Sequence, residues 1–334
     1  MMNAPCVGTT GFEPSWRPYS VVTVPPHPPC EKRPLDSRPP AFDTCSMKTL
    51  TWRPWRSYLR FRLRGLIVLV LVFGCWLGWI VRSTHIQRDA VAAIRQSGGF
   101  VAYDWEWKDN ERIPNGRPWA PQWLVDSLGA DYFGCVVFVS NKKSEWSDEE
   151  MVPLRNLSRL EKLALSSSRV TRAGLAHLKG LTNLRRLNLH NTQVGDEGLG
   201  FLDELTELRN LSLYDTKVGD AGLAHLKGLT RLRWLCLSGT KVGDVGLAHL
   251  EGLTNLQSLF LDGTRVCDAG LAHLEGLTSL EALHLSRDQV SDAGLIHLKG
   301  LTRLQGLYLD GTRVSDAGAS ELQFKALPHT MVKR

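Results

Sequence analysis

A row of aspartates recurs at a fixed spacing, and carboxylates in a row could bind a metal ion. Each opens a D-x-G motif, and successive copies lie 24 residues apart, at Asp196, Asp220, Asp244, Asp268, Asp292 and Asp316. A calcium or magnesium site needs several oxygens around one ion, and no second acidic row faces this one. Each aspartate except the last, where Ala319 replaces the leucine, precedes a leucine expected in a helical turn, where a carboxylate accepts hydrogen bonds from the first N–H groups. We therefore interpret the row as helix caps and predict no metal site there.

A row of histidines raises the same question for zinc or for a pH sensor. The row consists of His177, His225, His249, His273 and His297, and Phe201 interrupts it. These side chains are expected on adjacent convex helices, about 8–10 Å apart. Zinc ligands must all come within about 2.1 Å of the ion, so the spacing argues against a zinc site. We interpret the row as a repeated residue at the solvent edge.

Motifs typical of enzymes are missing from the chain. There is no G-x-S-x-G elbow, no P-loop and no H-E-x-x-H zinc helix. No two cysteines form a C-x-x-C pair, and the spacing suggests no disulfide framework among Cys6, Cys30, Cys45, Cys75, Cys135, Cys236 and Cys267. We predict a protein that is not an enzyme, with no catalytic residue, no cofactor and no metal.

The elements that position these rows follow from leucines at the same spacing. The leucines lie 24 residues apart, at Leu160, Leu184, Leu208, Leu232, Leu256, Leu280 and Leu304. Stacked identical units produce such a spacing. Within one unit, Leu211 and Leu213 share one face of a strand, while Leu223 and Leu226 share one face of a helical turn. One strand and one turn cannot enclose a core, so neighbouring units must bury their leucines together.

Two smaller residues recur in the connections. Threonines with a hydroxyl that could bond the neighbouring loop backbone stand at Thr192, Thr216, Thr240, Thr264 and Thr312, and Asp288 breaks their row. Glycines that suit a left-handed cap at the end of the helical turn stand at Gly180, Gly228, Gly252, Gly276 and Gly300.

Phrases such as LTNLRRLNLHNTQVGDEGL and LTRLRWLCLSGTKVGDVGLAHLKGL resemble the units of the leucine-rich-repeat family. With a degenerate first unit from residue 136 and an end near Phe324, we place the repeats at 136–324 and a C-terminal tail at 325–334. The predicted fold is α/β: a leucine-rich-repeat solenoid, or horseshoe, with a parallel concave sheet and short convex helices. The phrase AVAAIRQSGGFVAYDW, with the residues before it, resembles bacterial membrane-anchored leucine-rich-repeat proteins that have one N-terminal transmembrane helix. That resemblance implies protein interaction without enzymatic activity and implies no particular partner.

The front of the chain divides by composition. Residues 1–46 hold ten of the sixteen prolines and are expected to be disordered; they are either a translated extension or a gene start placed too early, since Met47 begins MKTLTWRPWRSYLRFRLR. Residues 65–81 carry no charge and are interpreted as a transmembrane helix or signal-anchor, in preference to a buried helix or a cleaved signal peptide. Residues 82–135 are expected to form a stalk and N-terminal cap, with helices at 86–96 and 122–128 and a strand at 100–107.

The net charge of +6 is confined to the residues before the apolar run. Residues 47–64 contain six basic residues and no acidic one, at Lys48, Arg53, Arg56, Arg60, Arg62 and Arg64. The positive-inside rule then predicts a single-pass protein with a cytoplasmic N-terminus and periplasmic or extracellular repeats. The balanced charge of the repeats argues against nucleic acid as a partner.

The strand residues that alternate with the buried leucines vary from unit to unit and form the predicted binding face. Tyr214, Trp234, Phe260, His284 and Tyr308 are expected to form an aromatic band across five strands, about 20 Å long. Lys162 and Arg186 add a basic end, and Asp262 and Asp310 add an acidic end. Exposed aromatic residues on a rigid sheet are typical of interface hot spots, although scattered apolar residues are also normal on surfaces. A polarised protein or peptide partner would suit the band.

Three function classes remain compatible with these patterns. The first is a membrane-anchored protein-binding scaffold, which the apolar run and the aromatic band favour. The second is a substrate receptor resembling the leucine-rich-repeat arms of ubiquitin ligases, although a membrane run stands where those carry a helical adaptor motif. The third is a secreted effector released by cleavage.

Overall fold

The protein is described by a computed structural model that covers residues 63–108, 111–113, 116–141 and 146–334 of the 334-residue chain. The predicted extension at 1–46 and the basic segment at 47–64 lie outside the described residues, apart from the backbone of the last two, which open the first helix.

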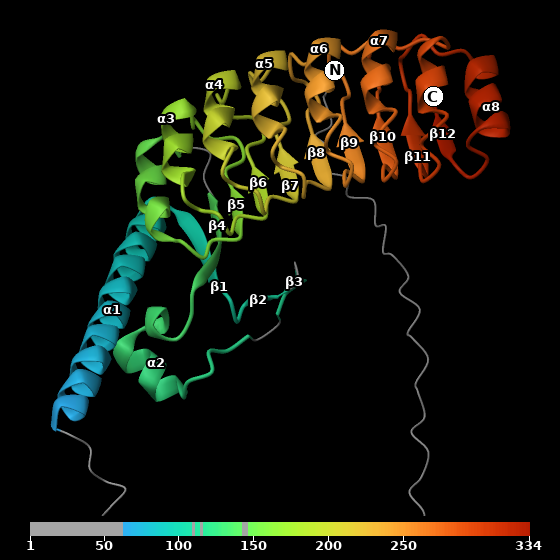
Figure 1. The fold of residues 1–334 in the computed structure, drawn as a ribbon. Helices are drawn as coiled ribbons and strands as arrows, with labels where there is room; N and C mark the ends of the chain where they lie inside the picture. Colours follow the sequence, from blue (N-terminus) through green and yellow to red (C-terminus); the bar gives the residue numbers. More distant parts are fainter. Residues whose placement is uncertain (1–62, 109–110, 114–115, 142–145) are drawn as a thin grey trace, which may run out of the picture. The chain divides into compact units, whose positions relative to one another are not determined.

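Ten strands form one sheet in the order β1-β4-β5-β6-β7-β8-β9-β10-β11-β12 (Figure 1). Their bounds are β1 Gly99–Tyr103, β4 Val136–Asn141, β5 Lys162–Ala164, β6 Arg186–Asn188, β7 Asn210–Ser212, β8 Trp234–Cys236, β9 Ser258–Phe260, β10 Ala282–His284, β11 Gly306–Tyr308 and β12 Met331–Lys333. β1 pairs with β4 in antiparallel fashion, and every later pair is parallel. The leucines pair in register, Leu211 with Leu235 and Leu235 with Leu259, so the 24-residue spacing becomes a step of one strand.

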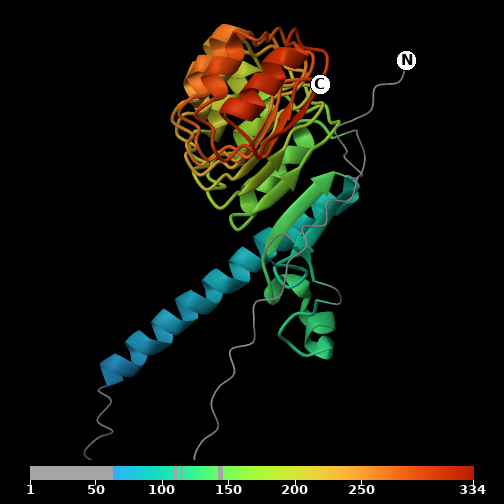
Figure 2. The same ribbon diagram turned by 90° about the vertical axis from the view of Figure 1, so that its right-hand side faces the viewer.

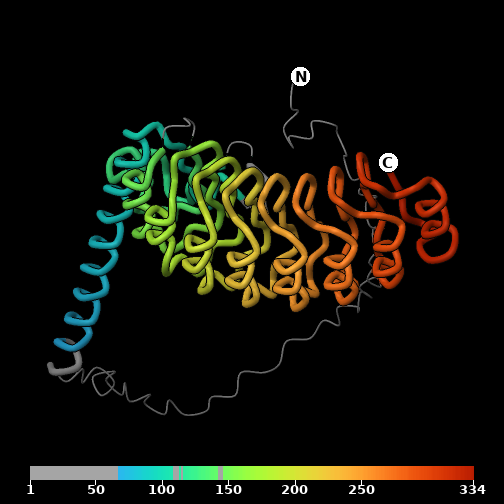
Figure 3. Tube along the Cα trace, turned by 90° about the horizontal axis from the view of Figure 1, so that it is seen from above, coloured from blue at the N-terminus to red at the C-terminus, as the bar shows by residue number. Residues whose placement is uncertain are grey.

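The repeats of β5 to β9 return from the strand through a short α-helical turn followed by a 3-10 turn, on the side opposite the sheet, and the repeat of β10 returns through a 3-10 turn. The α-helical turns are α3 Arg172–Leu175, α4 Asp196–Leu199, α5 Asp220–Leu223, α6 Asp244–Leu247 and α7 Asp268–Leu271. The 3-10 turns are η4 Ala176–Leu178, η5 Gly200–Leu202, η6 Ala224–Leu226, η7 Ala248–Leu250, η8 Ala272–Leu274 and η9 Gly294–Leu298. Figure 3 shows the repeats as successive turns of one coil. This arrangement confirms the predicted solenoid.

The leucine rows form one continuous core along the stack. Leu211, Leu213, Leu223, Leu226 and the connecting Val218 are all fully buried, as their spacing predicts. Each unit contributes the same set, and the buried residues join into a single cluster from Ala90 to Leu327. Stability therefore depends mainly on contacts between neighbouring units.

The aspartate row does not cap its own helices, contrary to our interpretation. In α4 to α7 the residue before the aspartate, such as Gly219, occupies the N-cap position, and no side-chain cap bond forms there. The carboxylate instead accepts a hydrogen bond from the next repeat: Gly219 N–H donates to Asp196 Oδ1 at 2.6 Å, and Gly243 N–H donates to Asp220 Oδ1 at 2.6 Å. The α-helical turn is only four residues long and places the carboxylate at its side, toward the following unit.

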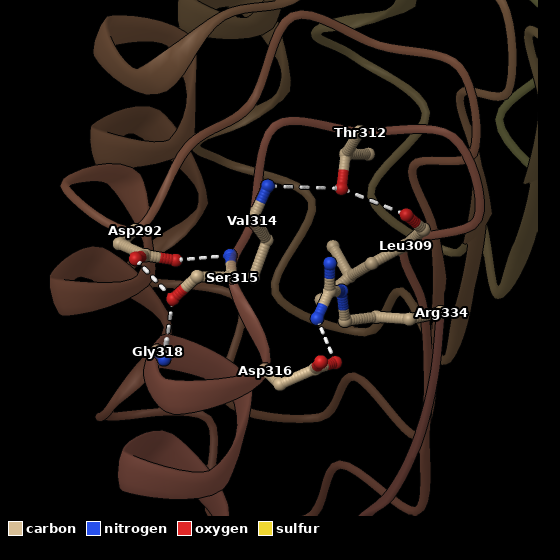
Figure 4. Close-up of polar contacts among 8 residues, drawn as sticks. All are labelled: Asp292, Leu309, Thr312, Val314, Ser315, Asp316, Gly318 and Arg334. Carbon is tan, nitrogen blue, oxygen red and sulfur yellow. Dashed lines mark hydrogen bonds and ion pairs between the residues drawn. The ribbon is translucent and has the colours of Figure 1, made fainter.

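The same inter-repeat bond recurs along the stack and reaches its end. Figure 4 shows the last copy, in which the backbone N–H and the hydroxyl of Ser315 both donate to Asp292, at 2.7 and 2.6 Å. Ser315 Oγ in turn accepts from the N–H of Gly318, which caps the C-terminal helix α8 Asp316–Lys325. We call this row of bonds the aspartate ladder.

The threonine and glycine rows also act differently from prediction. The Thr192 and Thr216 hydroxyls donate to the carbonyls of Leu189 and Leu213 in their own repeats, at 2.8 and 2.7 Å, and not to a neighbouring loop. Of the five glycines, only Gly180 has a left-handed backbone. The left-handed position lies after the strand instead, at Ser167, Asn191, Asp215, Gly239, Gly263, Arg287 and Gly311.

The N-terminal helix α1 is one continuous element, Leu63–Gln96 (Figure 2). The apolar run and the helix predicted at 86–96 therefore belong to the same helix, because the charged residues between them interrupt the hydrophobicity without breaking the helix. Residues from Ile67 to Trp79 expose their apolar side chains, whereas Ala90, Val91 and Ile94 are buried in the solenoid core. Among the described residues, α1 is the helix whose length and composition suffice to cross a membrane, from Ile67 to Gln96.

The cap between α1 and the repeats contains β1, the small hairpin of β2 Trp107–Lys108 and β3 Glu111–Arg112, the helix α2 Gln122–Leu128 and the 3-10 turn η2 Ala130–Tyr132, and the 3-10 turn η3 Glu149–Asn156 follows β4 in the degenerate first unit. The helix at 122–128 coincides with its predicted bounds. Trp146 of the degenerate first unit is buried, and its indole N–H donates to the carbonyl of Ser97 at 3.1 Å. At the other end, the residues assigned to the tail include β12, which continues the sheet beside β11. The repeat pattern ends before β12, so periodicity alone gives no signal for it.

Candidate binding face

The open face of the sheet presents the side chains that alternate with the buried leucines. In β9, Leu259 points into the core and is fully buried, while Ser258 and Phe260 on either side of it are partly exposed. Phe260, His284 and Tyr308 occupy the same position of three neighbouring strands and pair in register. Because neighbouring strands lie about 4.8 Å apart, flat rings at this position can stack along the sheet.

Three of these rings stack, and Trp234 makes a tilted contact with the ring of Phe260 at one end of the stack. The ring centroids of Trp234 and Phe260 are 5.3 Å apart, those of Phe260 and His284 are 4.2 Å apart, and those of His284 and Tyr308 are 3.9 Å apart. The last two pairs are nearly parallel, with interplanar angles of 24° and 11°. We call Trp234, Phe260, His284 and Tyr308 the aromatic ridge.

Tyr214, the fifth predicted member of the band, stacks on His190 at 4.6 Å with an interplanar angle of 18°. Both residues lie just beyond the ends of their strands, β7 and β6. Burial lowers the pKa of His190, and Asp215 opposes this effect. His190 stands in the same row as Tyr214 in the repeat register, so the sequence contained the signal that places it there.

At the acidic end of the face, Asp262 is held by hydrogen bonds that the sequence does not indicate. Asp262 accepts hydrogen bonds from Ser286 N–H at 3.0 Å and from the Ser238 hydroxyl at 3.1 Å, whereas Asp310 is exposed. Burial lowers the pKa of His284, and both aspartates oppose that shift. Burial dominates, which favours the neutral ring within the ridge.

Sequence reasoning missed a lysine at this end. Lys333 in β12 places its Nζ 5.5 Å from the centroid of the Tyr308 ring, a cation–π distance. It follows the last repeat, so no periodic pattern could assign it to the face. The ridge thus ends on a cation as well as on the carboxylate of Asp310.

The predicted basic end is only partly open. Lys162 is buried, and its Nζ lies 4.7 Å from the ring of Trp107, which packs on Phe138 at 5.0 Å. The cap therefore covers the position that the repeat register assigned to the open face. Arg186 is partly exposed in β6, and burial lowers its pKa, although a guanidinium stays charged at any physiological pH.

Three histidines of the row on the helical side pair with acidic residues of the preceding repeat. His225 Nδ1 lies 3.2 Å from Asp203, and the Nδ1 atoms of His273 and His297 lie 2.6 Å from Glu251 and Glu275. In the part of the chain that the structure describes, no group of three or more histidine, cysteine or acidic side chains is arranged to hold a metal ion. Each pair consists of one imidazole and one carboxylate, which is too few ligands for a zinc ion.

Three solved structures with a similar fold are bacterial proteins. An internalin C2 of Listeria monocytogenes is 23% identical, with a TM-score of 0.50, over 63% of this chain and 89% of that one. An internalin of the same organism (inlF) is 24% identical, with a TM-score of 0.47, over 55% of this chain and 49% of that one. A leucine-rich-repeat protein of Leptospira interrogans is 20% identical, with a TM-score of 0.40, over 55% and 56%. The chain thus spans about half the length of two of the three.

No protein-family model and no curated protein matches the chain. At identities below one quarter, the likeness to the solved structures concerns the fold alone.

Proposed function

Because the chain folds as a leucine-rich-repeat solenoid with an aromatic ridge across its open sheet, we propose that it is a non-enzymatic, membrane-anchored binding module for a protein or peptide. The ridge is the single observation that carries this proposal. Aromatic rings held on a rigid sheet lose little conformational freedom when a partner binds, which is why such residues dominate interface energies.

The geometry of the ridge favours a polypeptide over a sugar or a quaternary ammonium ligand. Sugars and ammonium groups bind over an open ring face. Here the faces of Phe260, His284 and Tyr308 cover one another at 4.2 and 3.9 Å, so their edges are left toward solvent. Ring edges are electropositive and suit carbonyl oxygens and apolar side chains, which an extended peptide presents in alternation.

The charges beside the ridge add polarity to the proposed site. Asp262 and Asp310 stand beside the His284 and Tyr308 end together with Lys333, and Arg186 stands near the cap. A partner with basic residues near the acidic end and an acidic group toward Arg186 would be complementary. Such rim charges chiefly set orientation and association rate, while the ridge supplies the affinity.

The membrane anchor is the second part of the proposal. The exposed apolar half of α1 and the basic residues before it support a single-pass protein with its N-terminus in the cytoplasm. The solenoid would then face the periplasm or the exterior, where its partner must be found.

The test compares the ridge with the helical side. Linear random peptides displayed on phage are selected against the full chain in detergent micelles, and an enriched peptide is measured against variants by titration. The double variant Trp234→Ala with Phe260→Ala should weaken binding at least tenfold, since one hot spot contributes about 2 kcal/mol. The matched control His249→Ala with His273→Ala should bind as the wild type does.

Both double variants should unfold within about 1 kcal/mol of the wild type, because the changed side chains lie outside the leucine core. Peptide binding that survives the ridge variant but is lost in the helical-side variant would place the site on the other face. Failure to enrich any peptide would remove peptide recognition from the proposal.

A further inference from the structure

The loop before α2 and α2 itself expose large apolar side chains beside α1. Trp119 is 81% exposed, Trp123 is 68% exposed and Leu128 is 45% exposed. No residue of α2 is buried, so Trp123 and Leu128 keep large apolar surfaces open to solvent, and Trp119 does so apart from its contact with the ring of Phe133. We call Trp119, Trp123 and Leu128 the cap platform.

The cap platform is fixed at the level where the exposed apolar part of α1 ends. Gln87 Nε2 of α1 donates to Gly134 O at 2.9 Å and to Asp131 Oδ1 at 3.2 Å. The rings of His85 and Tyr132 meet edge to face at 6.3 Å, and those of Trp119 and Phe133 at 5.6 Å. Residues 131–134 therefore join the platform to α1 at residues 85–87.

That level corresponds to the membrane–water boundary if the apolar run lies in a bilayer. The run ends at Val81, and Thr84 is the first residue of the following turn that the protein buries. From Arg82 to Gln87 the helix rises only about 7.5 Å, which is within the headgroup region. Figures 1 and 2 both place α2 below the sheet, on the side toward which the N-terminal half of α1 extends.

The chemistry of the platform matches the same boundary. Tryptophan carries an apolar ring and one N–H donor, and it concentrates where a bilayer changes from acyl chains to headgroups. Arg82, directly after the apolar run, and Arg117, two residues before Trp119, are both exposed and can approach lipid phosphates. A soluble partner would explain the exposed rings but not their place beside the end of the apolar run.

We propose that the cap platform inserts into the interface of the same bilayer that α1 crosses. The proposal rests on the membrane anchor of the proposed function. Two contacts, α1 and the platform, then hold the cap, and through it the solenoid, at one fixed orientation to the membrane. A single helix alone would leave the solenoid free to rotate about the helix axis.

Photocrosslinking to lipid tests the inference on the full chain. The photoreactive residue p-benzoylphenylalanine is placed at Trp123, at Val70 in the apolar run, and at Ser320 in α8 as a solvent control. Each protein is reconstituted into vesicles of phosphatidylcholine and phosphatidylglycerol and irradiated, and adducts are identified by mass. Lipid adducts are expected at positions 123 and 70 and not at position 320.

The outcomes separate the two proposals. An adduct at 70 without one at 123 overturns the platform and leaves the anchor intact. An adduct at 123 without one at 70 overturns the anchor and keeps the platform as a peripheral contact. A protein adduct at 123, from a second copy, replaces the lipid interface with a docking surface and overturns the inference.

Discussion

One aspartate is buried where the other repeats have threonine. Asp288 is 3% exposed, and its Oδ1 accepts from the N–H and the hydroxyl of Thr264 at 2.7 and 3.0 Å. Its Oδ2 is buried without a hydrogen-bond partner. Burial raises the pKa of Asp288 to about 7, against the lowering effect of the Thr264 bonds. The proton therefore stays on this carboxyl in the folded protein at a pH where the unfolded chain has lost it.

Because of Asp288, the free energy of unfolding should decrease as the pH rises. Between about pH 4 and pH 7 the unfolded state binds fewer protons than the folded state, so the free energy of unfolding decreases as pH rises and levels off above pH 7. Asp288→Asn keeps the acceptor and removes the titration. It should stabilise the protein at about pH 8, on the order of 2 kcal/mol, and change little near pH 4.

Urea unfolding across this pH range measures the effect. The exposed Asp215→Asn serves as the control, since a left-handed backbone accommodates asparagine. Parallel pH profiles for the wild type and Asp288→Asn would contradict the raised pKa.

At the residue scale, the sequence predicted which residues lie in the same row of the sheet better than it predicted which side chains they contact. The repeat register placed Phe260, His284 and Tyr308 side by side correctly, because a fixed spacing fixes strand register. It could not show that Lys162 lies under Trp107 or that Lys333 reaches Tyr308, since both contacts come from segments outside the repeats. The assignment of these residues to a binding site stays a prediction.

At the scale of the element, the D-x-G motif joins two neighbouring turns. A Cβ built on Gly246 would meet Asp220 Oδ1 at 2.5 Å, closer than real contacts allow. The glycine of one repeat therefore makes room for the aspartate of the preceding one. One repeat lacks this pair, because Arg172 stands in the place of the aspartate, and a Cβ on Gly198 meets side-chain carbons at 3.1 and 3.3 Å as its nearest contacts.

The pairing predicts a coupled response to mutation. Gly246→Ala should destabilise the wild type by about 1–3 kcal/mol through the clash with the carboxylate. Asp220→Ala should cost about 1.5–3 kcal/mol through the lost bond to Gly243 N–H. In the double variant the clash is relieved. Its loss of stability should therefore be smaller than the sum of the two single losses, by about 0.5 kcal/mol or more, which is about the smallest coupling that a cycle resolves.

Gly198→Ala is the matched control and should cost less than Gly246→Ala, since no carboxylate faces it. Denaturant midpoints of the four proteins in the cycle give the coupling. Simple additivity of the Asp220 and Gly246 changes would show that the two residues do not interact.

Element boundaries were predictable where the pattern had a local signal. Pro121 marks the start of α2, and the repeats give each strand its place. The continuity of α1 was not predictable from hydrophobicity, because Arg82, His85 and Arg88 interrupt the apolar run while the helix continues through them. The aspartate ladder was not predictable either. A carboxylate at the start of a helical turn is expected to accept hydrogen bonds from its own helix, and the sequence gives no sign that the acceptor serves the next repeat instead.

At the scale of the whole molecule, orientation in the membrane decides which partners the ridge can meet. An alkaline phosphatase fused after Arg334 is active only outside the cytoplasm and should be active in this protein. The six basic residues at 47–64 drive the expected orientation, so their joint replacement by serine should reduce the activity or invert the topology.

Immunoblotting of the fusion controls for expression and for release. A stable but inactive fusion would exclude the outward orientation. A shortened chain in the medium would instead support the secreted effector that the sequence left open.

The aspartate ladder also bears on how such a chain can change its length. Each bond joins a carboxylate to the backbone N–H that lies 23 residues later, and the strands pair with an offset of 24. A tandem duplication of one 24-residue unit in the gene would therefore copy the carboxylate, its N–H donor and the glycine that makes room for it together. Every bond on either side of the insertion would form again without compensating change. The open face would widen by one strand, about 4.8 Å, and mutation could then alter its new side chains independently of the scaffold.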